Sequence, residues 1–228
     1  MIRLGEKQEL SVLKKVEFGV YVGEETNREE RVLLPRKQVP EGTEIGDKLE
    51  VFVYRDSKDR LIATTTEPKL LLHKTGVLRV AAVGKIGAFL DWGLEKELFL
   101  PFKEQTRKVA VGEECLVALY IDKSSRLCAT MNVYPYLQQD SPYHKDDMVQ
   151  GTVYEISDNF GAFVAVDNLY SALISKKELD GPVRIGDQIT GRVVQVKEDG
   201  KLDLSIREKA YLQIKKDAEK ILNVIDSY

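Results

Sequence analysis

Three copies of one sequence pattern follow one another in this chain, and this repeat limits the possible folds more than any other feature. Each copy has an opening apolar segment with a glycine, a second short apolar segment, a glycine before a long apolar segment, and a closing segment that begins with Arg or Lys. The opening segments are residues 17–22, 85–93 and 159–166, and the closing segments are residues 60–65, 126–131 and 201–206. Three copies of the pattern predict three copies of one domain.

The spacing between landmark residues supports this alignment. In each copy the second segment ends eleven positions before the next glycine, in the pairs Pro35 and Gly46, Pro101 and Gly112, and Ser175 and Gly186. The first copy has two extra residues, which fall in the polar stretch 23–30. A longer loop has little energetic cost there, so the difference is compatible with one shared fold.

Each copy has the pattern of about five short strands. Runs of Val, Ile, Leu and aromatic residues are interrupted by Gly, Pro, Asp and Asn, which is typical of strands joined by turns. With 228 residues in all, a copy has at most 76. This size, with no long helical period inside, predicts a small closed barrel such as the OB-fold, which leaves no strand edge exposed. We therefore expect an all-β protein of three tandem five-stranded OB-fold barrels.

Composition shifts indicate the domain boundaries. Pro and polar residues concentrate in 67–74 and 133–147, which we interpret as linkers, the second being the hinge. The predicted barrels are residues 1–66, a divergent copy, then 75–132 and 148–207. From Tyr211 onward apolar residues recur every three or four positions, which predicts an amphipathic C-terminal α-helix over 208–228. Such a helix either packs on the third barrel or begins a further domain.

The composition excludes several classes of protein. With 43% hydrophobic and 31% charged residues the chain can fold, so disorder is excluded as its main state. Apolar runs are only a few residues long, far short of the roughly 18 residues of a membrane helix. The start of the chain lacks the features of a secretory signal, so we expect a cytoplasmic protein.

The two cysteines, Cys115 and Cys128, fit a reducing compartment. If the segment around Asp122 to Ser125 is a hairpin turn, residue 121 pairs with 126 and residue 119 with 128. Cys115 would then lie opposite residue 132, out of bonding reach of Cys128. We predict two buried thiols.

No catalytic or metal-binding motif occurs in the chain. C-x-x-C, H-E-x-x-H, the P-loop and G-x-S-x-G are all missing, and the histidines, His73 and His144, both lie in the predicted linkers. We predict no catalytic residue, no metal ligand and no cofactor, and hence a protein that is not an enzyme. The net charge of −3 also excludes a polycation held to nucleic acid by bulk charge.

The pattern of the copies resembles the RNA-binding OB-fold domain first described in ribosomal protein S-one. The third copy is the most similar, with GTVYEISDNFGAFVAV, ISKKEL, IGDQITGRVVQV and GKLDLSIRE. The order of three such domains and a helical segment is similar to the bacterial conserved virulence factor B (YitL-like) family. This resemblance implies a cytoplasmic RNA-binding regulator whose relatives end in a winged-helix domain. Only the opening helix of that domain fits here, so we expect a truncated or shorter member. DNA or protein partners that bind through this incomplete C-terminal segment stay an open alternative.

Strand alternation predicts which rings face outward. In the second copy Ala88 and Leu90 share one face and Phe89 takes the other, and the same parity holds in the other two copies. The outward rings are then Tyr21, Phe89 and Phe163. An exposed ring on a barrel wall is a platform for an unstacked base, although strand aromatics also serve as core or interface residues.

The resemblance implies a second RNA-contacting aromatic on the next strand. Phe99 supplies it in the second copy, while the first and third copies have Leu33 and Leu173. Phe18 and Phe160, just before the glycines, substitute in part. Trp92, in the turn after the strand, is either a lid on the barrel or a further platform.

Phosphate contacts require cations near the rings. Related domains place a backbone-contacting base where the last strand of each copy opens, and the matching residues are Arg60, Arg126 and Lys201. Lys85 is a further candidate. Residues 76–132 contain eight Lys and Arg against seven Asp and Glu, and residues 149–207 contain seven against nine. The second copy is therefore the better-charged site.

We predict a non-catalytic protein that binds single-stranded RNA through several weak barrels acting together and regulates gene expression or translation. Tethered sites raise each other's effective concentration, so weak sites suffice. The alternative is a protein-interaction scaffold that has lost RNA binding, which the net negative charge and the missing second aromatics favour.

Overall fold

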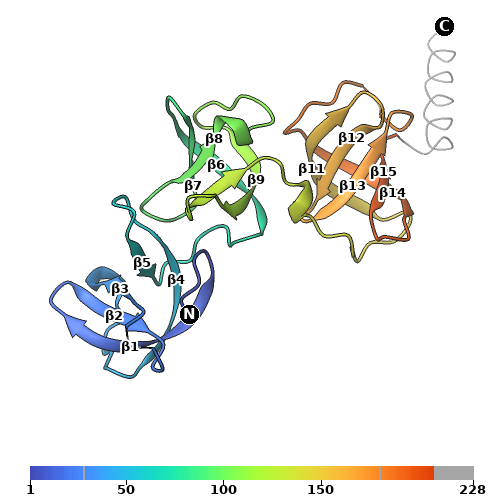
Figure 1. Ribbon diagram of the computed structural model, residues 1–228. Helices are drawn as coiled ribbons and strands as arrows, with labels where there is room; N and C mark the ends of the chain where they lie inside the picture. Colours follow the sequence, from blue (N-terminus) through green and yellow to red (C-terminus); the bar gives the residue numbers. More distant parts are fainter. Residues whose placement is uncertain (28, 180, 208–228) are drawn as a thin grey trace, which may run out of the picture. The chain divides into compact units, whose positions relative to one another are not determined.

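The computed structural model describes residues 1–27, 29–179 and 181–207, and their regular secondary structure is almost entirely β (Figure 1). Their strands form three closed barrels of five strands each. The predicted all-β class and the three tandem barrels are confirmed. The predicted helix over 208–228 lies outside the described residues.

The strands have the following bounds. Barrel 1 consists of β1 (Lys7–Val16), β2 (Gly19–Gly23), β3 (Arg31–Pro35), β4 (Lys48–Arg55) and β5 (Leu61–Thr64). Barrel 2 consists of β6 (Thr75–Val83), β7 (Gly87–Asp91), β8 (Leu98–Pro101), β9 (Glu114–Ile121) and β10 (Leu127–Thr130). Barrel 3 consists of β11 (Met148–Ser157), β12 (Gly161–Val166), β13 (Tyr170–Ser175), β14 (Gln188–Val196) and β15 (Leu202–Ser205). Short 3₁₀ turns are η1 (Arg36–Gln38), η2 (Phe102–Glu104) and η3 (Tyr134–Tyr136).

The three barrels share one topology. In each, the first strand pairs with the second and the fourth, the second with the third, and the fifth lies between the third and the fourth. The third and fifth strands pair in parallel, and all other neighbours are antiparallel. The first strand of each barrel also has a register shift at one place, next to Val12, Val80 and Val153. The repeat seen in the sequence is therefore a repeat of fold.

The shared glycine at the start of the second strand has a steric cause. A Cβ on Gly19, Gly87 or Gly161 would lie only 2.1–2.3 Å from a carbonyl oxygen at the end of the third strand. Any side chain would force the two strands apart. Glycine at this position lets the second and third strands pair up to their ends.

The other shared glycine, before the long fourth strand, makes a different contact, with the first strand at its register shift. Gly46, Gly112 and Gly186 have positive φ values of 95°, 89° and 99°, which residues with a Cβ rarely adopt. Each donates its N–H to the carbonyl of the valine beside the register shift, at 2.8 Å. The spaced glycines of the repeat thus mark two structural contacts that every barrel makes.

The barrel interiors are filled by the residues that the alternation predicted. Ala88 and Leu90 are fully buried in β7, whereas Phe89 between them is only half-buried and lies outside the core cluster. Barrels 1 and 3 have separate apolar clusters with the same alternation. Inward positions are therefore small or aliphatic, and the aromatic position of the second strand is outward.

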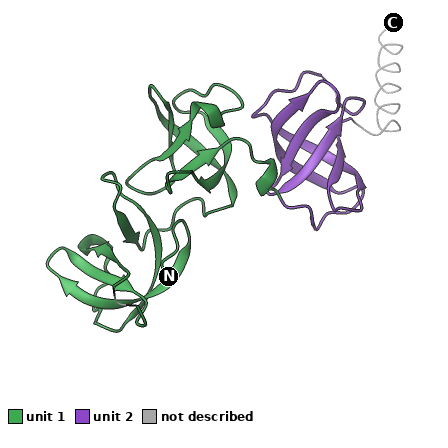
Figure 2. Ribbon diagram, viewed as in Figure 1, with its two compact units in different colours: residues 1–137 green, residues 138–228 purple. Residues whose placement is uncertain are grey.

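The chain divides into two compact units, residues 1–137 and the part from residue 138 onward (Figure 2). This boundary falls inside the segment 133–147 that we predicted to be a linker. The other predicted linker, 67–74, is not a solvated connection. Leu70 is buried in the apolar cluster of barrel 2, and Leu72 forms a β-bridge with Leu119.

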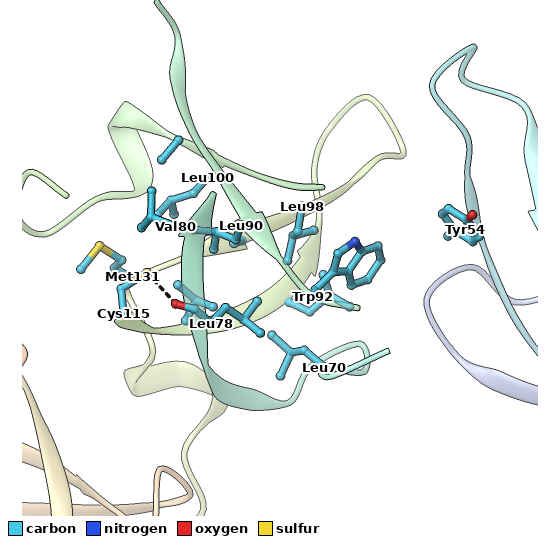
Figure 3. Packing of buried hydrophobic residues seen from close by; sticks show 14 of the residues in the cluster. Tyr54, Leu70, Leu78, Val80, Leu90, Trp92, Leu98, Leu100, Cys115 and Met131 are labelled. Carbon is cyan, nitrogen blue, oxygen red and sulfur yellow. Dashed lines mark hydrogen bonds between the residues drawn. The ribbon is translucent and has the colours of Figure 1, made fainter. Parts of the chain in front are cut away.

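The second half of strand β4 of barrel 1 is buried on both faces. Val51 and Val53 belong to the core of barrel 1, whereas Phe52 and Tyr54 belong to the apolar cluster that includes Trp92 of barrel 2. The Trp92 ring makes edge contacts with Phe52 and Tyr54, at 5.7 and 6.3 Å between ring centroids. Figure 3 shows the indole turned toward the ribbon that carries Tyr54.

The position of Trp92 decides between our two alternatives for this residue, a lid on the barrel or a further platform. The side chain is only 2% exposed, so it is not a surface platform for stacking. It covers the end of barrel 2 and is itself covered by barrel 1. A contact between two domains buries it, which strand alternation within one domain does not predict.

The hairpin register differs from the prediction by one residue. Leu127 lies opposite Ile121, where residue 126 was expected. The Asp122 N–H donates to the Arg126 carbonyl at 2.8 Å, which closes a three-residue loop, and Ser125 in that loop has a φ of 55°. A three-residue loop ending in a left-handed residue pairs the strands one position further along than the predicted turn.

The two cysteines are free and buried, as predicted. Burial raises the pKa of the Cys115 thiol and of the Cys128 thiol to about 11. Both are therefore protonated and weakly nucleophilic near neutral pH.

Candidate nucleic-acid interface

The three rings at the centre of the predicted interface are outward in every barrel. Tyr21, Phe89 and Phe163 occupy the middle of β2, β7 and β12, are half-buried, and belong to none of the core clusters. Their orientation agrees with the predicted parity. Their contact with RNA stays a prediction.

Each ring belongs to a line of side chains that crosses the outer face of its barrel, which we call the outer row. Register places the ring beside one residue of the third strand and, beyond that, one residue of the fifth. The outer rows are Tyr21, Leu33 and Ile62 in barrel 1; Phe89, Phe99 and Cys128 in barrel 2; and Phe163, Leu173 and Asp203 in barrel 3. The same backbone therefore presents three different surfaces.

Barrel 2 has two aromatic rings in its outer row. The centroids of Phe89 and Phe99 are 5.4 Å apart, with the ring planes tilted by 37°. Ile86, one residue before the glycine of β7, is 66% exposed at the edge of this face. Sequence reasoning missed Ile86, although it aligns with Phe18 and Phe160.

Barrel 3 has an aromatic group of different composition. Phe160 is 61% exposed, and its ring lies 6.4 Å from that of Phe163 in an edge contact. Tyr154 also packs against Phe163, at 6.2 Å between centroids. It lies at the register shift of β11, where barrels 1 and 2 have Leu13 and Ala81. Sequence reasoning missed Tyr154 because the shift alters the strand parity locally.

In barrel 1 a cation covers the outward ring. The guanidinium carbon of Arg31 lies 5.0 Å from the centroid of the Tyr21 ring, a cation–π distance. Phe18 is 58% exposed nearby in sequence. Arg31 was not predicted as a site residue. The arrangement resembles a base-stacking site whose ring face is already occupied by an arginine.

The three matching cations lie at equivalent hairpins, and each forms an ion pair. The pairs are Arg60 with Asp56 at 2.7 Å, Arg126 with Asp122 at 3.7 Å, and Lys201 with Asp199 at 2.9 Å. Sequence reasoning placed the cations but did not predict their carboxylate partners. Because each charge is partly neutralised within its hairpin, these cations attract phosphate less strongly than isolated ones.

Asp56 shows how firmly one of these pairs is held. Burial acts to raise the pKa of the Asp56 carboxyl, but hydrogen bonds from the Arg60 side chain and from the backbone of Arg60 and Lys58 outweigh it and lower the pKa. Lys85, in the turn between β6 and β7, is exposed and forms no ion pair with any described residue. It is the predicted cation with the fewest competing contacts.

The described ranges hold no group of three or more His, Cys, Asp or Glu arranged to bind a metal ion. Across the same part of the chain no helix is long and apolar enough to cross a membrane.

Two protein families match the chain. The S1 domain, which is the S-one type named above, matches residues 4–66 and 74–132. The second domain of the virulence regulatory factor CvfB matches residues 135–208. Both are families of binding domains or regulatory factors, and neither is catalytic.

Relatives with similar sequences cover most of the chain. The uncharacterized protein YitL of Bacillus subtilis is 29% identical over 97% of this chain and 76% of its own length. Conserved virulence factor B of Staphylococcus saprophyticus is 24% identical over 87% of this chain and 70% of its own length. The resemblance to this group of proteins is thus confirmed.

A solved structure has a similar fold. It is a multidomain protein with nucleic-acid-binding domains from Streptococcus pneumoniae, with a TM-score of 0.58 and 21% sequence identity, and the match covers 98% of this chain and 81% of that one.

Proposed function

Because this chain belongs to the S1 domain family, we propose that it is a non-catalytic protein that binds single-stranded RNA and thereby regulates gene expression or translation in the cytoplasm. The predicted domains 1–66, 75–132 and 148–207 are its binding modules. The observation that carries the proposal is the pair of half-buried rings, Phe89 and Phe99, side by side on the outer face of barrel 2.

Paired rings suit single-stranded RNA because unpaired bases expose their faces. Stacking on an aromatic side chain contributes about 1–3 kcal/mol per base and tolerates any base identity. Phe89 and Phe99 are backed by a rigid barrel wall, so little side-chain entropy is lost when a base binds. Barrels 1 and 3 each add one outward ring, Tyr21 and Phe163, to the same kind of surface.

Charge favours barrel 2 as the principal module. Eight basic against seven acidic residues lie between residues 76 and 132, while the whole chain has a net charge of −3. Affinity should therefore come from stacking with a modest ionic contribution. Each neutralised phosphate of a single strand adds roughly −0.7 to the slope of log affinity against log salt concentration.

Several weak modules suffice for useful affinity. A strand held by one barrel meets the others at a high effective concentration set by the linkers. The relatives support a regulatory role, since one is named conserved virulence factor B and the similar structure has nucleic-acid-binding domains.

The test is the affinity of the full chain for fluorescently labelled purine-rich and pyrimidine-rich oligoribonucleotides, measured by anisotropy at increasing salt. Phe89→Ala should weaken binding by about 1–3 kcal/mol. Val111→Ala, an exposed position of barrel 2 outside the outer row, is the matched control and should leave affinity unchanged. Binding that responds neither to salt nor to Phe89→Ala contradicts the proposal.

The second candidate is a protein-interaction scaffold that has lost RNA binding. The ion pairs of Arg60, Arg126 and Lys201 and the single ring in the outer rows of barrels 1 and 3 favour it. A wild-type chain that fails to bind either oligoribonucleotide at low salt would support the scaffold.

A further inference from the structure

A pocket of about 280 Å³ opens beside the outer row of barrel 2, within the first compact unit. Its lining comes from both barrels of that unit. Phe89, Phe99, Trp92 and Arg126 line it from barrel 2, and Tyr54 and Arg55 line it from barrel 1. The ring pair of the proposed RNA site therefore forms part of the wall of a cavity, and the end of β4 forms another part.

Direct contacts hold the wall from barrel 1 in place. Tyr54 packs edge-on against Trp92, and the next residue, Arg55, donates from its Nε to the Ser125 carbonyl of barrel 2 at 3.1 Å. From the other side, Lys96 of barrel 2 donates from its Nζ to the Asp56 carbonyl of barrel 1 at 2.9 Å. Because apolar and polar contacts act together, Arg55 is positioned by both barrels.

The lining offers one kind of group to a base and another kind to its phosphate. Phe89, Phe99 and Trp92 offer an aromatic interior, while Arg55 and Arg126 bring guanidinium groups to the same cavity. Arginine binds phosphate oxygens through a fork of donors and also stacks on planar rings. The lining also contains the carboxylate of Glu97, which repels a phosphate from its part of the cavity.

The volume limits what can enter. Pockets for drug-sized ligands span roughly 300–1,000 Å³, and this pocket lies just below that range. One planar base fits this limit better than a dinucleotide does. The ribose and the phosphates of a longer strand would stay outside, within reach of the two arginines.

We infer that this pocket binds one unstacked base of single-stranded RNA, and that Arg55 of barrel 1 contacts the phosphate next to it. Barrels 1 and 2 then form one composite site. The inference rests on the proposed function and adds to it the base pocket and the contribution of barrel 1. It also gives barrel 1 a role beyond that of its own outer row, where Arg31 lies over the Tyr21 ring.

The test compares Arg55→Gln with Lys58→Gln in the full chain. Both remove one positive charge from the same β4–β5 hairpin, but Lys58 is exposed and outside the pocket. Arg55→Gln should weaken binding of a labelled oligoribonucleotide by about fivefold to tenfold, the size of one charge-assisted contact. Lys58→Gln should change it less than about twofold, as expected of an exposed charge. Arg55→Lys, which keeps the charge, should recover part of the loss.

A second measurement uses the single tryptophan of the chain. Because Trp92 lines the pocket, a base that enters should change its fluorescence in a saturable way when a short oligoribonucleotide is added. Phe99→Ala should abolish the change. Thermal melting of each variant shows whether it is folded.

The outcomes separate this inference from the function on which it rests. A wild type that binds RNA, with equal affinities for Arg55→Gln and Lys58→Gln and a constant Trp92 emission, overturns the composite pocket and leaves the RNA-binding function intact. A wild type that binds no RNA overturns both. A selective loss in Arg55→Gln together with a Trp92 response supports the pocket.

Discussion

Barrels 2 and 3 have the same strand order and the same glycine contacts, but their outer rows carry different chemistry. Where barrel 2 has Phe99 and Cys128, barrel 3 has Leu173 and Asp203. The inward positions of both barrels are small or aliphatic. Packing constrains the inside of a barrel, and the outer face is free to change. The comparison teaches that one fold can carry outer faces of different chemistry.

The outer rows of barrels 2 and 3 also differ in charge. Asp203 carries a carboxylate at the end of the outer row of barrel 3, beyond Leu173, and the Lys197 ammonium lies 2.9 Å from it. At the equivalent place barrel 2 has the thiol of Cys128, whose pKa burial raises to about 11, so that it is neutral. A polyanion therefore meets a neutral row on barrel 2 and an acidic residue on barrel 3.

The largest expected effect tests whether the two barrels are separate folding units. Leu100 and Ile174 are fully buried in the cores of barrels 2 and 3. Changing either to Ala should lower the free energy of unfolding of its own barrel by about 2–5 kcal/mol, since a cavity is left behind. Chemical unfolding followed by Trp92 fluorescence reports barrel 2, and circular dichroism reports the whole chain.

Leu100→Ala should therefore shift the transition seen by Trp92, and Ile174→Ala should leave that transition in place. Equal shifts in the two variants would show that the barrels unfold together.

The next effect concerns the second ring of the outer row. Phe99→Ala should reduce RNA affinity by about 1–3 kcal/mol, because one stacking surface is lost. Leu173→Ala, at the same station of barrel 3, should change affinity far less, since an aliphatic side chain gives no stacking platform. Anisotropy titrations of the two variants at one salt concentration provide the measurement. Similar losses in both would mean that the two outer rows bind RNA equally.

The smallest expected effect is a gain in RNA affinity. The double substitution Leu173→Phe and Asp203→Asn gives barrel 3 a second ring beside Phe163 and removes the carboxylate from its outer row. We expect RNA affinity to rise by about 1 kcal/mol, the range of one aromatic pair. The control is the single substitution Asp203→Asn, which should give a smaller gain. If RNA affinity does not rise in the double variant, the rest of barrel 3, and not its outer row, limits RNA binding.

Much of the fold could be predicted because its signals are local. Period-two alternation placed Ala88 and Leu90 inside and Phe89 outside, and the repeat spacing located the glycines whose contacts recur in every barrel. The predicted register of the hairpin at Asp122 to Ser125 was wrong by one residue. Its loop has three residues and ends in the left-handed Ser125, which residue types alone do not reveal. The carboxylate partners of Arg60 and Arg126 follow from that same loop geometry.

By itself, the sequence determined the number of barrels, the five short strands of each and the outward position of one ring in each, because repeats and alternation are properties of short stretches of chain. Only the tertiary structure decided that Trp92 is buried against Phe52 and Tyr54, and that Arg55 lies beside the rings of barrel 2. Those contacts join residues more than thirty positions apart in two domains. Their geometry depends on how the barrels of one unit pack, and no periodicity along the chain encodes that packing.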